Sequence, residues 1–272
     1  MTLAVAFKGP EGVVLAADSR VTLSTIQKTD TKELQVLSYF DNATKLLSFA
    51  SRPNIGVVTS GLGALGTTQP RTIHGFTPEF EAKLSEDHGD DEMKVADIAR
   101  SLGQFYLDQW NTIGVPPGAE PIMFLIAGYD SDEPYGRVFE VSVPGAIEPV
   151  EYWPGDFGVR YTGDWALADR IINGIDPRAL NLAKEELTLR DNQVTRLKER
   201  WAKELKPNIP YRFLPLQDCV DLATFLVTTT AVVQGWTVGS RAVGGPVDVA
   251  TITRTEGFQA IRQKQIEVKD WR

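Results

Sequence analysis

The residues that could do chemistry begin at the second position, where a threonine follows the initiator methionine. Removal of Met1 would give Thr2 both a hydroxyl nucleophile and a free α-amine. The α-amine has an ordinary pKa of about 7.7–8.0, so its neutral form can accept the hydroxyl proton at cellular pH. The only histidines, His74 and His88, lie in no recognisable catalytic motif. A mechanism without histidine or cofactor therefore fits this composition.

A carboxylate follows at a position where it could act on that amine. Asp18 comes directly after the apolar run Val13–Ala17, so its carboxylate is predicted to be poorly hydrated and to require a cationic partner. An ordinary surface ion pair is the alternative.

The elements that must position these residues alternate between groups of strands and groups of helices. Strands are predicted at Leu3–Phe7, Val13–Ala17, Leu46–Ala50, Ile55–Ser60, Ile122–Tyr129, Gly136–Val143, Val159–Thr162 and Val247–Thr253. Helices are predicted between Gly61 and Pro70, at Met93–Ile113, from Trp165 to about Lys206, and at Leu216–Trp236. The polar segment Ser19–Thr44 is predicted as a long loop or a ragged pair of strands. This order favours one α+β domain, residues 1–272, in which helices cover two packed sheets.

The opening segment Thr2–Thr22, TLAVAFKGPEGVVLAADSRVT, resembles the start of mature proteasome β subunits and of their bacterial relatives. In that family a threonine begins the first strand, a glycine-containing turn follows, and the second strand ends in Ala-Asp-x-Arg. The register matches without a gap from Thr2 to Asp18. The resemblance implies the four-layer α-β-β-α sandwich of N-terminal nucleophile hydrolases and a threonine peptidase. The first strand follows at once, which favours a β-type over an α-type subunit.

The family also places a lysine just before its third strand, and the matching context here, Asn42–Phe49, assigns Lys45 as the partner of Asp18. Lys32 is closer to the family's usual spacing from the threonine but lies in polar sequence with no following strand. A protonated Lys45 near Thr2 would lower the pKa of the α-amine by repulsion, and Asp18 would keep the lysine charged.

A second landmark is Gly56–Gly63, GVVTSGLG, which resembles the strand and glycine turn that form the family's oxyanion hole. The resemblance implies that the backbone N–H of Gly61 stabilises the oxyanion, because a residue without Cβ lets substrate approach the main chain. The same correspondence places Val21, Thr22 and Thr59 along a groove for an extended peptide.

The match weakens toward the C-terminus. The family's aspartate and serine before two glycines correspond to Ser240 and Val243, and a second family serine corresponds to Asp164. One hypothesis is an exchange, in which Asp164 supplies the carboxylate and Ser240 the hydroxyl that orient the threonine amine. The alternative is a degenerate site that is slow or inactive. A charged helical insertion around residues 179–206 looks longer than the family norm.

The amino-acid composition limits the kinds of partner that the protein can have. The net charge of −8 argues against nucleic acid and anionic membranes, and no apolar run was expected to be long enough to cross a bilayer. Cys219 is the only cysteine and is predicted to lie in the core. The acidic run Glu86–Glu92 is predicted to be a solvated loop and not a metal site. A cytoplasmic protein is expected.

Other interpretations stay open at this point. Gly61–Gly66, GLGALG, matches the dinucleotide-binding fingerprint, although Pro70 would stop the helix that should follow. A non-catalytic structural ring subunit is a further alternative, and transpeptidation would use the same chemistry as hydrolysis. The resemblance implies a homo-oligomeric ring or spiral that acts on peptides or unfolded proteins, and it leaves room for an ATPase unfoldase as partner.

Overall fold

Two five-stranded antiparallel sheets form the centre of the molecule. The computed structural model describes residues 2–28, 33–89, 91–239 and 241–266, and within this range it leaves out the side chains of residues 24–35. One sheet has the order β12 (Gly158–Gly163), β1 (Leu3–Lys8), β2 (Val13–Asp18), β13 (Val247–Thr253) and β14 (Gly257–Arg262). The other has the order β11 (Val150–Tyr152), β10 (Arg137–Val143), β9 (Ile122–Gly128), β6 (Arg52–Gly61) and β5 (Leu46–Phe49).

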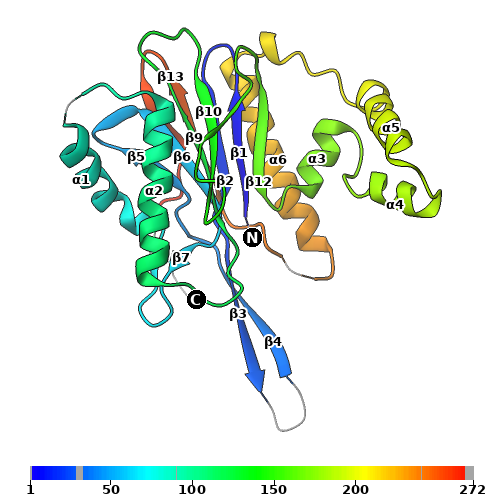
Figure 1. Ribbon diagram of the computed structural model, residues 1–272, viewed down its shortest axis with the longest axis horizontal. Coiled ribbons are helices and arrows are strands. Elements are labelled where there is room, and N and C mark those ends of the chain that lie inside the picture. The colour runs from blue at the N-terminus through cyan, green and yellow to red at the C-terminus, as the bar shows by residue number, and fades with distance from the viewer. Residues whose placement is uncertain (1, 29–32, 90, 240, 267–272) are drawn as a thin grey trace, which may run out of the picture.

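The two sheets pack face to face around a shared apolar layer (Figure 1). Small alanines of β1 and β2 contribute to this layer together with Leu15, Val58 and Leu125. Every residue of β1 and β2 is buried, because both faces of these strands are covered. This burial explains why their sequences are continuous apolar runs and do not alternate.

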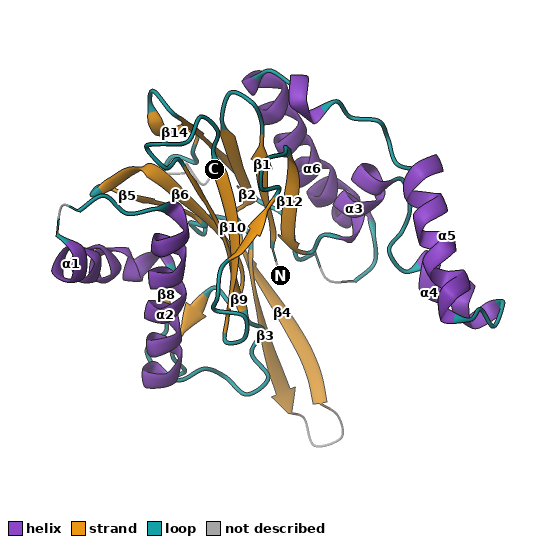
Figure 2. Cartoon of the chain, turned by 45° about the horizontal axis from the view of Figure 1, so that its top comes forward, coloured by secondary structure: helices purple, strands orange, loops and turns teal. Residues whose placement is uncertain are grey.

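Helices cover the outer face of each sheet. Helices α1 (Thr77–His88) and α2 (Val95–Ile113) pack on the sheet that contains β6, in a cluster rich in phenylalanine. Helices α3 (Ala166–Asn173) and α6 (Leu216–Trp236) pack on the sheet that contains β1. Figure 2 shows the two groups of helices on opposite sides of the strands. The predicted α+β class is therefore present, with antiparallel sheets.

The helical insertion around residues 179–206 lies beside the two packed sheets and the helices that cover them. Helices α4 (Ala179–Glu186) and α5 (Asp191–Glu204) contain no buried residue, and they lie outside α3 and α6 (Figure 2). A Cβ on Gly174 would lie 1.9 Å from the carbonyl oxygen of Leu205. The chain therefore leaves the body and returns to it at nearly the same place.

Between Ser19 and Thr44, where a long loop or a ragged pair of strands is predicted, the chain forms a long regular hairpin. Strands β3 (Val21–Lys28) and β4 (Glu33–Phe40) pair over eight residues each and project away from both sheets (Figure 1). The polar, threonine-rich composition obscured how regular this pairing is. Threonine has a high strand propensity, and it was the usable signal.

The predicted helix between Gly61 and Pro70 is wrong. This segment contains the short strand β7 (Ala64–Leu65), which pairs with β8 (Arg71–Thr72). Gly61 and Gly66 both have positive φ, and glycine readily adopts these angles, which do not continue a right-handed helix. The dinucleotide interpretation fails with it, because no helix opens here and the neighbouring strands are antiparallel.

Helix α6 corrects the expectation that no segment could span a bilayer. By length and composition alone it is long and apolar enough to do so. One face of it packs on the sheet through Cys219, Ala223 and Leu226, whereas Phe225 and Trp236 are exposed.

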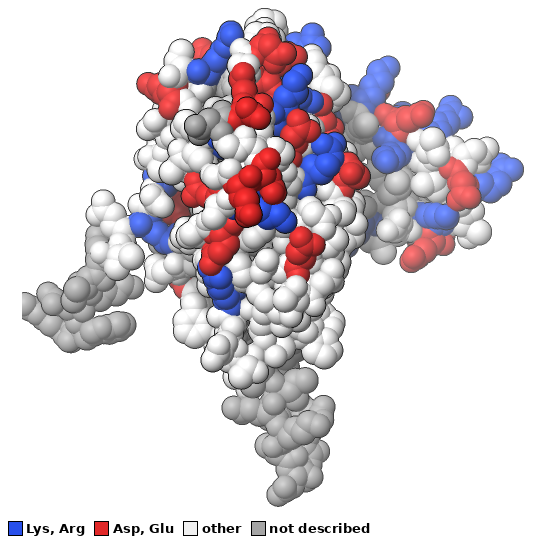
Figure 3. Space-filling view, turned by 60° about the vertical axis from the view of Figure 1, so that its left-hand side comes forward, with Lys and Arg blue, Asp and Glu red and all other residues white. Residues whose placement is uncertain are grey.

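Charges are interspersed over the face of the molecule that Figure 3 shows. Exposed ion pairs around α2 also place opposite charges side by side, as in Arg100 with Glu148 and Lys83 with Asp108. The net negative charge is therefore not gathered into a single acidic patch on this face.

Candidate active site

Thr2 lies at the start of β1, where the turn after β12 holds its backbone. The residue is 4% exposed, and its carbonyl oxygen accepts a hydrogen bond of 2.7 Å from the backbone N–H of Asp164. Gly163 has a φ of +86°, and a Cβ there would lie 1.8 Å from the same oxygen. Only glycine fits this contact, so the turn fixes the position of Thr2.

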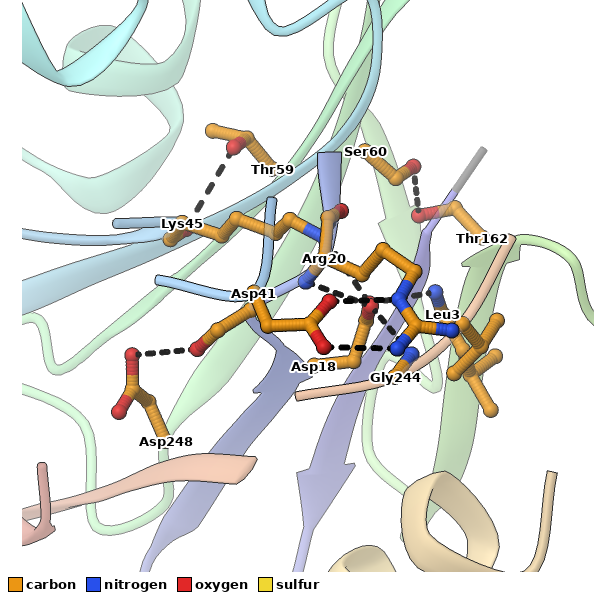
Figure 4. Close-up of polar contacts among 12 residues, drawn as sticks. Leu3, Asp18, Arg20, Asp41, Lys45, Thr59, Ser60, Thr162, Gly244 and Asp248 are labelled. Atoms are coloured by element: carbon orange, nitrogen blue, oxygen red, sulfur yellow. Dashed lines mark hydrogen bonds and ion pairs between the residues drawn. The ribbon is translucent and has the colours of Figure 1, made fainter. Parts of the chain in front are cut away.

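Asp18 ends β2 in the same sheet as β1 and is almost completely buried. Its carboxylate accepts hydrogen bonds from the backbone N–H groups of Leu3 at 3.1 Å, Gly244 at 3.0 Å and Arg20 at 3.1 Å. The residue after Thr2 is thus tied directly to the Asp18 carboxylate. Figure 4 shows these contacts converging on one side chain.

Lys45 completes the surroundings of Asp18. Its Nζ lies 3.0 Å from Asp18 Oδ1 and 2.6 Å from the carbonyl oxygen of Arg20, and the residue is only 7% exposed. The surface ion pair considered as the alternative is therefore wrong. Burial lowers the pKa of Lys45 and raises the pKa of Asp18, whereas their mutual attraction opposes both changes. Lys32 lies outside the described residues.

A second buried ion pair, Asp248 with Lys264, lies near the Asp18–Lys45 pair and was not predicted from the sequence. Asp248 on β13 is 2% exposed and accepts hydrogen bonds from the backbone N–H of Lys264 at 2.9 Å and from the Lys264 ammonium. The Ser19 hydroxyl lies 3.4 Å from the same carboxylate. Since Ser19 lies between Asp18 and Arg20, this pair supports the turn that presents both acceptors to Lys45. Its partners are far apart in sequence, so no local motif marks it.

Arg20 anchors the base of the projecting hairpin. Its guanidinium makes two hydrogen bonds to the Asp41 carboxylate, at 2.6 and 2.7 Å, and lies 5.2 Å from the ring centroid of Tyr39. A bidentate contact of this kind fixes orientation as well as distance. The loop that leads from β4 to Lys45 is thereby held against the end of β2.

A cleft of about 750 Å³ opens over Thr2. Six of the predicted site residues line it: Thr2, Val21, Thr22, Lys45, Thr59 and Gly61. The cleft runs past the base of the β3–β4 hairpin to His74 and, from a different segment, to Glu120. Residues far apart in the sequence thus share one concave surface.

The floor and walls of the cleft carry hydroxyl groups. Ser60 and Thr162 make a hydrogen bond of 2.9 Å between the two sheets. The Thr22 Oγ1 atom is buried and has no hydrogen-bond partner among the described residues. A polar atom left in this state is costly, and a ligand lying in the cleft could satisfy it.

Gly61 ends β6 at the edge of this cleft. Its φ is +83°, and a Cβ there would lie 1.9 Å from the carbonyl oxygen of Pro121. The position therefore requires glycine because of its positive φ and its close contact with the backbone of Pro121.

The predicted supporting network is only partly present. Asp164 lies beside Thr2, as its backbone contact shows. The side chain of Val243 is fully buried in the apolar cluster under α6, so it supplies no hydroxyl. Ser240 lies outside the described residues, and the hydroxyl half of the exchange hypothesis therefore stays a prediction.

Gln234 was missed by the sequence reasoning. Its Nε2 donates to Asp164 Oδ2 at 2.7 Å, and its Oε1 accepts from the backbone N–H of Val243 at 2.9 Å. In the sequence it is the one amide within the apolar run Ala231–Trp236. A polar residue within this short apolar stretch was the available signal, since buried polar groups need partners.

The described residues contain no group of three or more His, Cys, Asp or Glu side chains arranged to hold a metal ion. The acidic run Glu86–Glu92 begins within α1 and continues past its end. The groups that line the cleft near Thr2 include hydroxyls and the Lys45 ammonium.

Comparison with known proteins gives two likenesses. No protein-family model matches the chain. A proteasome subunit alpha of Methanoregula boonei is 26% identical over 197 residues, which cover 68% of this chain and 70% of that protein. The solved structure of an Anbu (Gly-1) mutant from Hyphomicrobium sp. strain MC1 matches all of this chain and 89% of its own, with a TM-score of 0.54 and 16% identity. The fold is therefore a mixed α+β fold of the proteasome-like kind.

Proposed function

We propose that the chain is a threonine-type peptidase of the β-type proteasome-like class, active once Met1 has been removed. The observation that carries the proposal is the position of Thr2, which lines a cleft of about 750 Å³ together with Lys45, the partner of Asp18. Peptides and unfolded proteins are the proposed substrates, because residues of the strands β3 and β6 line the cleft and strand backbone can pair with an extended chain.

The proposed reaction uses Thr2 twice. Its Oγ attacks the carbonyl carbon of a peptide bond while its α-amine accepts the hydroxyl proton. The backbone N–H of Gly61 is the proposed donor to the oxyanion. The tetrahedral intermediate then collapses: the C–N bond breaks, the leaving amine takes the proton, and an ester to Thr2 remains. Water hydrolyses the ester, or a second amine takes the acyl group in transpeptidation.

The Asp18–Lys45 pair has a defined part in this reaction. A cation at Lys45 destabilises the protonated α-amine and so increases its neutral fraction at cellular pH. Asp18 keeps Lys45 in place through the 3.0 Å contact and ties the adjacent Leu3 N–H to the same carboxylate. The Asp18–Lys45 pair would thus lower the pKa of the Thr2 α-amine and also hold the start of β1 in position.

The likenesses also support proposals about architecture and assembly. We infer the four-layer α-β-β-α sandwich of N-terminal nucleophile hydrolases from the two packed sheets with helices on their outer faces. A homo-oligomeric ring or spiral in the cytoplasm would enclose the cleft, and an ATPase unfoldase could feed it. Enclosure would restrict access to unfolded chains.

A non-catalytic structural subunit is the second candidate. The likeness to a proteasome subunit alpha favours it, as does the buried, apolar Val243 at a position where the resembling family carries a hydroxyl. This candidate predicts an assembled particle with no Thr2-dependent activity.

The test is hydrolysis of fluorogenic peptides by protein whose chain begins at Thr2. Thr2→Ala should abolish turnover, because the hydroxyl is lost, whereas Thr2→Ser should retain measurable activity. Thr195→Ala, an exposed substitution on α5, is the matched control and should match wild type. Equal turnover by Thr2→Ala and wild type would contradict the proposal and favour the structural subunit.

A further inference from the structure

Gln234 lies near the C-terminal end of α6 and takes part in none of the steps proposed above. Its side-chain amide makes two hydrogen bonds, to Asp164 Oδ2 at 2.7 Å and from Val243 N–H at 2.9 Å. Only one orientation of the amide satisfies both, because the carboxylate needs a donor and the backbone N–H needs an acceptor. The orientation of Gln234 is therefore fixed by its two partners.

The two hydrogen bonds close a circuit around the start of β1. On one side, the backbone N–H of Asp164 donates to the carbonyl oxygen of Thr2 at 2.7 Å. On the other side, Gly244 follows Val243 and donates to Asp18 Oδ2 at 3.0 Å. The circuit passes in order through Thr2, Asp164, Gln234, Val243, Gly244, Asp18 and Leu3. Segments far apart in the sequence are thus joined through one side chain.

The circuit restrains the Asp164 carboxylate. Gln234 holds Oδ2, whereas Oδ1 has no hydrogen bond among the described residues. Val243 cannot supply a hydroxyl at this place, because its side chain is apolar and fully buried. Without Gln234, the described residues would offer the carboxylate no side-chain donor, and no hydrogen bond would restrain the direction of the Asp164 side chain.

We propose that Gln234 is a positioning residue, whose amide holds the Asp164 carboxylate toward the α-amine of Thr2. The proposal rests on the proposed function, in which that amine is the base. In the hypothesis drawn from the sequence, the hydroxyl of Ser240 helps Asp164 to orient the threonine amine. Here the amide of Gln234 on α6 takes that supporting role.

The charges around the α-amine of Thr2 determine the direction in which its pKa should change when Gln234 is lost. Asp164 and Asp18 favour the protonated amine, and Lys45 disfavours it. A carboxylate that turns away from the amine stabilises its charged form less. Loss of Gln234 should therefore lower the pKa of the Thr2 α-amine, a change that a merely structural role would not produce.

The experiment compares Gln234→Leu with Gln217→Leu in protein whose chain begins at Thr2. Gln217 also lies on α6 and also donates to an aspartate, Asp221, at 2.9 Å, but it is exposed and about 25 Å away along the helix. The pKa of the α-amine is read from the pH dependence of its trace acetylation, measured on the N-terminal peptide by mass spectrometry. The kcat and KM for peptide hydrolysis are measured alongside.

Gln234→Leu should lower the pKa of the Thr2 amine by about half a unit or more. It should reduce kcat roughly 10- to 100-fold and leave KM within about twofold, because substrate contacts are untouched. Gln217→Leu should behave as wild type. If Gln234→Leu does not fold, Gln234→Glu keeps the volume and the acceptor for Val243 and should show the same loss of kcat.

A double-mutant cycle sharpens the test. If Gln234 acts through Asp164, adding Gln234→Leu to Asp164→Asn should cause no further loss in kcat. Asp156→Asn, an exposed aspartate beside Arg212, is the control for Asp164→Asn and should leave kcat unchanged. Full additivity of the two losses would overturn the proposal, as would an unchanged amine pKa in Gln234→Leu.

Failure of the proposed function is distinguishable from failure of this inference. If wild-type protein hydrolyses no peptide but Gln234→Leu still lowers the amine pKa, the positioning role is supported and the peptidase assignment is contradicted. If wild type hydrolyses peptides and Gln234→Leu matches Gln217→Leu in both readouts, the positioning role is contradicted alone.

Discussion

The backbone of Gly163 approaches the carbonyl of Thr2 so closely that a Cβ on Gly163 would lie 1.8 Å from that oxygen. Gly163→Ala therefore requires Thr2 or the turn after β12 to move. We expect this substitution to cost roughly 1–3 kcal/mol through the clash, in addition to about 1–2 kcal/mol for its left-handed backbone. Peptidase activity should fall with the displacement of Thr2. Urea unfolding and peptide turnover measure the two effects.

Gly118→Ala is the matched control for this substitution. Gly118 also has a positive φ, +75°, but a Cβ there meets nothing within 4 Å. It should show the backbone cost alone and keep full activity. Equal stability and activity of the two variants would show that the Gly163 contact does not fix Thr2.

Removing the ammonium of Lys45 should leave the Asp18 carboxylate buried without its cation. Such an unpaired buried charge costs roughly 3–5 kcal/mol, so Lys45→Ala should be strongly destabilised as well as inactive. Lys94→Ala removes one side of an exposed pair with Asp132, separated by 3.9 Å, and should change the free energy of unfolding by less than about 0.5 kcal/mol. Comparable values for the two variants, from denaturant titration, would contradict the role given to burial.

The helical insertion should be dispensable for the core. Replacing residues 176–203 with two glycines removes no buried side chain of α4 or α5 and joins points that are already adjacent, since Gly174 lies against Leu205. We expect the melting temperature to change by less than about 4 °C. Loss of cooperative unfolding would instead assign the insertion to the core. Deletion of α1, which buries Phe80 and Leu84, should abolish folding.

Cys219 should report on the packing of α6. Burial, with smaller contributions from Asp218 and Glu11, raises the pKa of the Cys219 thiol to about 12. At pH 8 this leaves roughly a thousandfold less thiolate than an ordinary thiol with a pKa near 8.5. Native protein should therefore react with iodoacetamide far more slowly than protein in denaturant, and mass spectrometry measures both rates. Equal rates would contradict the packing of this helix on β1 and β2.

The part of the fold that could be predicted from the sequence is the part that local patterns determine. The apolar runs before Asp18 and after Lys45 predicted strands, and the helical spacing of Met93–Ile113 predicted a helix over residues that α2 largely occupies. Long, continuous patterns of this kind follow directly from burial. The glycines at positions 61 and 66 were misread, because positive φ is not visible in a residue pattern.

The parts of the site that could not be predicted depend on contacts between distant segments. Asp18 was found from the apolar strand before it, and Lys45 was found through the resembling family, which carries a lysine just before its third strand. Gln234 and the Asp248–Lys264 pair have no such local mark, since their partners come from other elements. Only the packing of α6 and of the segment after β14 brings these groups to the site.

Intact mass spectrometry after incubation with a peptide epoxyketone tests the central claim most directly. The Thr2 hydroxyl adds to the ketone and the α-amine of the same residue opens the epoxide, so a ring joined to the inhibitor through both atoms forms only where both groups share one residue. We expect a chain without Met1 that gains the full inhibitor mass, with the added mass on the N-terminal residue in the fragment spectrum of the N-terminal peptide. A chain that keeps Met1, or a processed chain that gains no mass at Thr2, would contradict that claim.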